Sequence, residues 1–427
     1  MPQLGSGRSF DFRWIPLCLA AAVAWSCATP LPVSNGPSPS PTPVPVTPFF
    51  TALPLPVSNG PSPSPVPVTP FFTASNHTTC ATTTLAAMTE DQRVGELFML
   101  GINGAAMSAA EAAALRAYRF GSTFLVNSRT GGVESIRTLT AQIQSLATDS
   151  NTHGVRLFIA ADQEGGYVQR LNGPGFDKIP TALEQGGLSP STLQADAVTW
   201  GKQLAAAGIN LNLAPVMDVV PPGTDADNAP IGALEREYGH DPTTVGDHGS
   251  AVVRGMAQAG VATTLKHFPG LGRVVGNTDN VGGVVDSVTT AQDPYLASFQ
   301  AGITAGAPFV MISLATYSKI DPDHQAVFST TIIGTILRRQ LGFSGVVISD
   351  DIGATAAVAS MAAGDRATAF IAAGGDLMIV SGVAAAGQMA VAVLSRARAD
   401  AAFAAQVNAA AARVLEAKAA YGLLSCR

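Results

Sequence analysis

Polar and charged side chains follow several apolar runs of the chain at the point where each run ends. They are Asp162 after residues 156–161, Lys266 and His267 after 261–265, and Asp350 and Asp351 after 346–349. A carboxylate that can act as a nucleophile or base, a cation, an imidazole and a second acceptor together suit a polyhydroxylated, largely uncharged ligand. The set therefore predicts a sugar-binding catalytic site. Structural alternatives are open for single residues, because an Asp also caps helices and a lone His is often part of a core.

Signatures of cofactors are missing from the sequence. It has no phosphate-binding loop, no dinucleotide fingerprint and no HExxH metal pair. The four cysteines, Cys18, Cys27, Cys80 and Cys426, show no CxxC spacing. We therefore expect no cofactor and no metal, and hydrolysis or group transfer by side chains alone.

Eight short apolar runs beyond residue 80 alternate with segments of helical periodicity, such as 135–147, 193–207 and 401–420. The runs are 97–102, 122–126, 156–161, 210–214, 261–265, 308–314, 346–349 and 377–380. Apolar strands that alternate with helices are typical of parallel β/α units, and eight units predict a (β/α)8 TIM-type barrel. A doubly wound open sheet is the alternative, but no Gly-x-Gly-x-x-Gly follows the first run. In such a barrel the catalytic side chains lie at the C-terminal ends of the strands.

Composition limits the partners of the protein. The 427 residues carry 24 basic and 30 acidic side chains, a net charge of -6, and 47% of the residues are hydrophobic. This balance offers no basic surface for phosphate backbones, so we expect no nucleic-acid partner. We expect a monomer with a sugar substrate.

The first 27 residues have the pattern of an export signal. Arg8 and Arg13 precede an apolar stretch over 14–25 that is too short to span a bilayer. Small residues then lead to Cys27, as in a bacterial lipoprotein signal. We expect lipidation at Cys27, with membrane attachment only through this N-terminal lipid, and a location on the outer face of the cell membrane. The alternative is cleavage nearby, which gives a secreted protein with a spare thiol.

Residues 28–79 have the composition of a disordered linker. The segment holds 15 of the 29 prolines, has no charged side chain, and contains a duplication, since 31–40 recurs as 55–64. The catalytic domain is therefore expected over 80–427. Cys80 and Cys426 bracket this domain, and in an oxidising exterior they are candidates for a disulfide. Two free thiols are the alternative.

Five segments of the predicted domain resemble, in order, the bacterial β-N-acetylglucosaminidases of glycoside hydrolase family three. They are the stretches 162–171, 213–218, 235–242, 266–272 and 342–351. The resemblance implies a retaining mechanism in which Asp350 attacks the anomeric carbon. It also implies that Asp162, Arg236, Lys266 and His267 bind the sugar hydroxyls and the N-acetyl group. Asp351 is expected to support its loop or cap the next helix.

One position departs from the pattern of the family. The family has an acid/base His in the order Asp-Ser-His after the fifth strand, whereas this chain reads Asn277, Thr278, Asp279. An Asp with a raised pKa can act as a general acid, and a neutral Asn beside it removes one source of repulsion. We therefore expect Asp279 to replace the His.

The sequence leaves three functions open. The first is an exo-glycosidase that removes terminal β-linked N-acetylglucosamine from peptidoglycan fragments. The second is a phosphorylase on the same fold, although an Asp at the acid/base position repels an incoming phosphate. The third is a muropeptide-binding lipoprotein without catalysis, which requires Asp279 to be inert.

Overall fold

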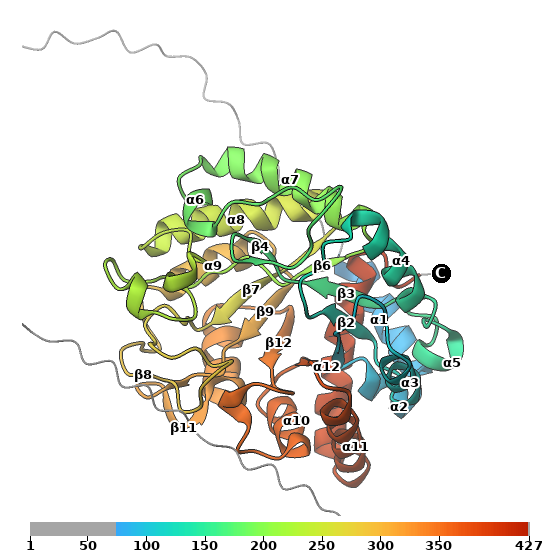
Figure 1. The fold of residues 1–427 in the computed structure, drawn as a ribbon. Helices are drawn as coiled ribbons and strands as arrows, with labels where there is room; N and C mark the ends of the chain where they lie inside the picture. The colour runs from blue at the N-terminus through green and yellow to red at the C-terminus, as the bar shows by residue number, and fades with distance from the viewer. Residues whose placement is uncertain (1–73, 426–427) are drawn as a thin grey trace, which may run out of the picture. The chain divides into compact units, whose positions relative to one another are not determined.

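The computed structural model describes residues 74–425 and places a closed barrel of eight parallel strands at their centre (Figure 1). In spatial order the strands run β1, β13, β12, β9, β7, β6, β3 and β2. Their bounds are β1 (Phe98–Ile102), β2 (Ser122–Leu125), β3 (Phe158–Ala161), β6 (Leu211–Asn212), β7 (Ala262–Phe268), β9 (Phe309–Ile312), β12 (Val346–Asp351) and β13 (Leu377–Val380). Each of the eight predicted runs overlaps one of these strands, with β7 and β12 continuing past the ends of their runs, which confirms the predicted (β/α)8 barrel.

The interior of the barrel is filled by side chains from alternating positions of the strands. Met99, Phe158, Leu211, Phe309 and Leu377 belong to this buried cluster. The rings of Phe158 and Phe309 meet edge to face with their centroids 5.2 Å apart, although their strands are not neighbours. Side chains on the opposite faces of the strands are buried under the helices. Burial on both faces explains why the strands read as continuous apolar runs.

An outer layer of helices covers the strands, with α7 to α9 on one side in Figure 1 and α10 to α12 on another. Polar residues cap the N-termini of several helices. The side chains of Ser108, Ser189 and Asp241 accept hydrogen bonds from backbone amides of the first turn. The helices are α2 (Glu90–Gly95), α3 (Ala109–Ala117), α4 (Gly132–Gln144), α5 (Asp149–Thr152), α6 (Ala182–Gln185), α7 (Pro190–Ala206), α8 (Pro242–Gln258), α9 (Leu296–Thr304), the π-wound η4 (Thr331–Gln340), α10 (Ala363–Ala372), α11 (Val383–Ala399) and α12 (Ala401–Ala420). None of the helices within residues 74–425 is long and apolar enough to cross a bilayer.

Short elements decorate the C-terminal ends of the strands. A hairpin of β4 (Gln163–Gly165) and β5 (Val168–Gln169) follows β3 directly. A second small sheet holds β8 (Val285–Asp286), β10 (Thr316–Tyr317) and β11 (Asp321–Gln325). Short 3-10 turns are η1 (Asp225–Asp227), η2 (Gly232–Leu234), η3 (Ala326–Phe328) and η5 (Ala356–Val358). Of these insertions, the β4–β5 hairpin and η2 line the pocket at this end of the barrel.

Helix α1 (Ala74–Ala87) precedes the barrel and packs against α12. It begins six residues before the predicted domain boundary, so 74–79 are helical and not part of an extended linker. The physical reason is that Pro70 is the last proline of the linker, so no proline interrupts a helix over 74–79. His77 and Thr78 share a groove with Pro308 and Val346, which lie at the N-terminal ends of β9 and β12.

The end of the described chain lies at the same face. Leu423 accepts a hydrogen bond at its carbonyl from the amide of Arg156, just before β3. The buried ammonium of Lys418 lies 2.5 Å from Glu96 Oε2 and donates to the Gly121 carbonyl at 2.8 Å. Both ends of the domain therefore reach the N-terminal mouth of the barrel.

Part of the N-terminal prediction lies outside the described residues. This holds for the export signal 1–27, the lipidation site Cys27 and most of the linker. Cys80 is disulfide-bonded. Because Cys426 also lies outside the described residues, its pairing with Cys80 stays a prediction.

Candidate active site

One pocket of about 400 Å³ opens at the C-terminal ends of the strands, and every predicted catalytic and sugar-binding residue lines it. These residues are Asp162, Arg236, Lys266, His267, Asp279 and Asp350. Apolar side chains at strand ends form the floor, including Phe124, Leu213 and Met311. The structure thus brings together side chains that are spread over nearly two hundred positions of the sequence.

Lys266 joins two carboxylates at the edge of the pocket. Its buried ammonium lies 2.6 Å from Asp162 Oδ1 and 2.6 Å from Glu164 Oε1. Burial alone would lower the pKa of Lys266, but the charges of Asp162 and Glu164 outweigh it and raise the pKa. Lys266 is therefore a fixed cation at neutral pH.

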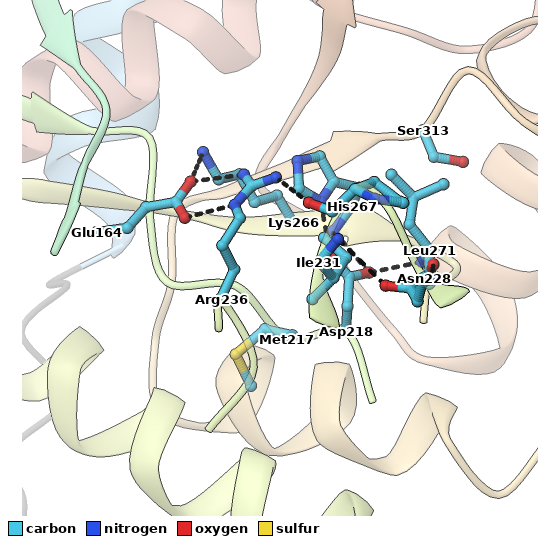
Figure 2. A network of polar contacts seen from close by, with 12 residues as sticks. Glu164, Met217, Asp218, Asn228, Ile231, Arg236, Lys266, His267, Leu271 and Ser313 are labelled. Atoms are coloured by element: carbon cyan, nitrogen blue, oxygen red, sulfur yellow. Dashed lines mark hydrogen bonds and ion pairs between the residues drawn. The ribbon is translucent and has the colours of Figure 1, made fainter. Parts of the chain in front are cut away.

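Glu164 stands between two cations, as Figure 2 shows. Its two carboxylate oxygens accept from Arg236, with Nε 2.8 Å from Oε2 and Nη2 2.7 Å from Oε1. Burial favours the neutral acid, but Arg236 and Lys266 hold the pKa of Glu164 well below its usual range. Arg236 also donates to the Pro230 carbonyl at 2.7 Å. The network presents oriented donors and acceptors to the pocket before any ligand arrives.

His267 is fixed by the fully buried Asp218. The Nδ1 of His267 lies 2.7 Å from Asp218 Oδ2, and the same carboxylate accepts from the backbone amides of His267 and Leu271 (Figure 2). Because Asp218 holds Nδ1, the other ring nitrogen is left for a ligand. A buried carboxylate thus sets the orientation of an imidazole at the mouth of the barrel.

Asp350 lies at the end of β12. Its Oδ1 accepts from the backbone amide of Asp351 at 2.8 Å. Burial raises the pKa of Asp350 to about 6, the charge of Asp279 adds to the rise, and His267 opposes it. A carboxyl with this pKa is ionised at neutral pH but poorly solvated, which suits a nucleophile.

Asp279 belongs to a surface loop that lines the pocket. Its backbone amide donates to Asn277 Oδ1 at 2.9 Å, and its carbonyl accepts from Ala356. Thr278 accepts in the same way from Ala357. Asp279 is exposed, and its carboxyl lies close enough to Asp350 for its charge to act on that residue.

Asp351 has the supporting role that the sequence predicted. Its Oδ1 accepts from the amides of Gly353 at 2.7 Å and Ser381 at 3.2 Å. These bonds tie the end of β12 to the end of β13. Asp351 therefore holds the backbone that carries Asp350.

Comparison with known proteins places the chain in a family. The Glycosyl hydrolase family 3 N terminal domain matches residues 89–417. The chain belongs to glycosyl hydrolase family 3. This family 3 enzyme is 34% identical over 295 residues to a Beta-hexosaminidase of Stenotrophomonas maltophilia (strain R551-3), a match that covers 66% of the chain and 83% of that relative.

Solved structures agree with this membership. The Beta-N-acetylhexosaminidase of Beutenbergia cavernae is 51% identical, with a TM-score of 0.77, over 78% of this chain and 99% of that one. A glycoside hydrolase family 3 beta-N-acetylglucosaminidase from Paenibacillus is 28% identical, with a TM-score of 0.70, over 79% and 64% of the two chains. The sequence-based resemblance is confirmed.

Two residues of the family 3 enzyme have roles that the sequence does not predict. Glu164 neutralises both Lys266 and Arg236. Asp218 orients His267. The available signal was the same for both, namely an acidic residue close behind an apolar run.

Proposed function

We propose that the enzyme removes terminal β-linked N-acetylglucosamine from peptidoglycan fragments by hydrolysis with retention of configuration. The observation that carries the proposal is the pair of carboxyls in one pocket, Asp350 half-buried near a strand end and Asp279 exposed. The names of the hexosaminidase and N-acetylglucosaminidase relatives support the choice of sugar. The expected export of the chain favours a cell-wall substrate.

In the first step, a carboxylate oxygen of Asp350 forms a bond to the anomeric carbon. The glycosidic bond breaks, and Asp279 gives its proton to the departing oxygen. The products of this step are a glycosyl ester on Asp350, an alcohol or sugar leaving group, and an ionised Asp279. The two carboxyl groups thus fill the nucleophile and acid roles of a retaining glycosidase.

In the second step, a water molecule attacks the anomeric carbon from the side that the leaving group vacated. Asp279 now takes a proton from this water, and the ester bond to Asp350 breaks. The sugar leaves with its original configuration, and both carboxyls return to their starting states.

The network around Lys266 supplies recognition in this proposal. Asp162 and Lys266 face the pocket as acceptor and donor for sugar hydroxyls, with Arg236 beside them. His267 offers its free ring nitrogen. Because these groups are already paired with one another, little reorganisation is needed when the sugar binds.

The test is release of p-nitrophenol from its β-N-acetylglucosaminide by the purified protein, with and without phosphate, beside Asp350→Ala. We expect turnover that does not depend on phosphate and falls at least about 10³-fold in the variant. Phosphate-dependent release of a sugar phosphate would instead indicate the phosphorylase. Binding of muropeptides without any turnover would indicate the non-catalytic lipoprotein.

We also propose that Cys27 carries the lipid that attaches the enzyme to the outer face of the membrane. The support is the sequence pattern of 1–27 alone. Labelling of cells with radioactive palmitate tests it: wild type should be labelled and Cys27→Ala should not. Label that survives in Cys27→Ala would contradict the proposal.

A further inference from the structure

Three side chains able to bind a metal ion lie together in the loop between β6 and α8. They are Asp225 in η1 and, further along, Glu237 and His240, and none of them lines the catalytic pocket. One oxygen or ring nitrogen from each residue lies within 4.8 Å of the others. His240 Nδ1 is 3.5 Å from Asp225 Oδ1 and 3.3 Å from the Val220 carbonyl.

The carboxyl of Glu237 is buried with no cation beside it among the described residues. The residue is 0% exposed, and the groups that reach its oxygens are its own backbone amide and the carboxyl of Asp225. Arg236 does not neutralise this charge, because its guanidinium is taken up by Glu164 and the Pro230 carbonyl. An uncompensated buried carboxylate is strongly unfavourable, so the arrangement calls for a positive charge.

We propose that Asp225, Glu237 and His240 bind a divalent transition-metal cation, with Zn²⁺ as the best match. Two carboxylates and one imidazole suit such an ion, whereas Mg²⁺ and Ca²⁺ prefer oxygen ligands. With metal–ligand bonds of about 2.0–2.2 Å, two ligands of tetrahedral zinc lie roughly 3.4 Å apart. The 3.5 Å between Asp225 Oδ1 and His240 Nδ1 already has this value.

Access and coordination are also consistent with an ion. The side chains of Asp225 and His240 are each 35% exposed, so the cluster is open on one side while Glu237 closes the other. Water can fill the fourth position of a tetrahedral ion from the open side. The sequence contains no compact metal-binding motif, because these ligands come from two separate parts of a long loop.

The ion would act as a positioning element for the pocket. Arg236 directly precedes Glu237, and Pro230, Leu234 and Arg236 line the pocket. A cation that joins η1 to residues 237–240 would hold this wall in place. It lies outside the pocket, so no step of the reaction passes through it.

Isothermal titration of untagged, EDTA-treated full-length protein with ZnCl2 tests the proposal. We expect one Zn²⁺ per chain at this site and a rise in Tm on binding. Glu237→Gln should weaken that binding at least about tenfold. Two matched controls are neighbours of the ligands that do not belong to the cluster: Asp227→Asn and Glu235→Gln should bind like wild type.

A folding defect can be separated from the loss of a ligand. Without metal, Glu237→Gln should melt at or above wild type, because an amide replaces an uncompensated buried carboxylate. Asp225→Asn and His240→Gln, at partly exposed positions, should also weaken binding. Absence of binding by wild type, or undiminished binding by Glu237→Gln, would overturn the proposal. The titration needs no substrate, so its outcome does not depend on the proposed reaction.

Discussion

The environment that makes Asp350 reactive also lowers the stability of the folded protein. Its pKa of about 6 means that the folded protein holds the proton more tightly than the unfolded chain, with its ordinary value near 3.8. Stability is therefore lost as the pH rises from about 4 to about 6, and the full penalty applies above that range. A poorly solvated nucleophile thus destabilises the fold at the pH at which it reacts.

Asp350→Asn is therefore expected to abolish turnover and to raise stability at pH 7.5. A rise of about two in the pKa of Asp350 corresponds to at most about 3 kcal/mol in the free energy of unfolding. Thermal melts at pH 7.5 and pH 4 check this, because the gain should disappear at the lower pH. An equal change in Tm at both values would contradict the assigned pKa.

Asp279→Asn is expected to act on both leaving-group chemistry and the pKa of Asp350. The variant lacks the acid, so kcat/KM should fall much more for a poor leaving group than for an activated aryl one. It also removes a nearby negative charge, so the acid limb of the aryl substrate profile should move from near pH 6 to lower pH.

The matched control for this variant is Asp323→Asn, an exposed aspartate outside the pocket, which should change neither property. Rates from pH 4 to 8 with two substrates of different leaving-group pKa suffice. Equal losses on both substrates would remove Asp279 from the acid role.

The buried carboxylate of Glu164 joins the hairpin β4–β5 to the loop after β6, which carries Arg236. Glu164→Gln leaves the cations of Lys266 and Arg236 facing each other with too little negative charge. We expect a loss of about 3–5 kcal/mol in the free energy of unfolding and at least about 100-fold in kcat/KM. Urea unfolding and steady-state kinetics measure the two losses.

Glu134→Gln is the matched control, because the same substitution there breaks the exposed pair with Arg137. That pair should contribute less than about 1 kcal/mol. If both variants lost equally little stability, the buried network would not stabilise the pocket as argued.

The predictability of elements depended on their length and burial. The eight strands were predictable because burial on both faces gives each a continuous apolar run. Strands β8 and β10 have two residues each and lie outside the eight apolar runs. The start of helix α1 was not predicted because residues 74–79 carry no apolar pattern of their own.

The site itself was predictable in its members and not in its pairings. Asp162 follows β3, and Lys266 and Asp350 lie in the C-terminal halves of β7 and β12, so their meeting at one mouth follows from the barrel. The bond between Glu164 and Arg236 depends on the path of a long loop that no periodicity describes. The cluster of Asp225, Glu237 and His240 could not be predicted for the same reason.

The ion pair of Lys418 and Glu96 joins the last helix, α12, to the chain just before β1 at the N-terminal mouth of the barrel. Burial lowers the pKa of Lys418, and Glu96 opposes this shift. Lys418→Met should cost about 3–5 kcal/mol of unfolding free energy, because it leaves Glu96 buried alone. The double variant with Glu96→Leu should recover most of the loss.

Turnover by the folded fraction of these variants should stay unchanged, because the pair lies at the end of the barrel opposite the pocket. Urea unfolding and kinetics on the same samples test both statements. A loss that simply adds in the double variant would show that the two groups do not act as a pair.

Both ends of the described domain emerge at the N-terminal mouth of the barrel, next to α1 and Leu423, while the pocket opens at the other mouth. A surface joined directly to residue 74 or 425 would thus lie at the end of the barrel opposite the pocket. A bulky polymer end could then approach along the barrel axis without meeting that surface. The same arrangement makes the domain suited to circular permutation, since a linker between residues 74 and 425 would run entirely across the face that no substrate needs.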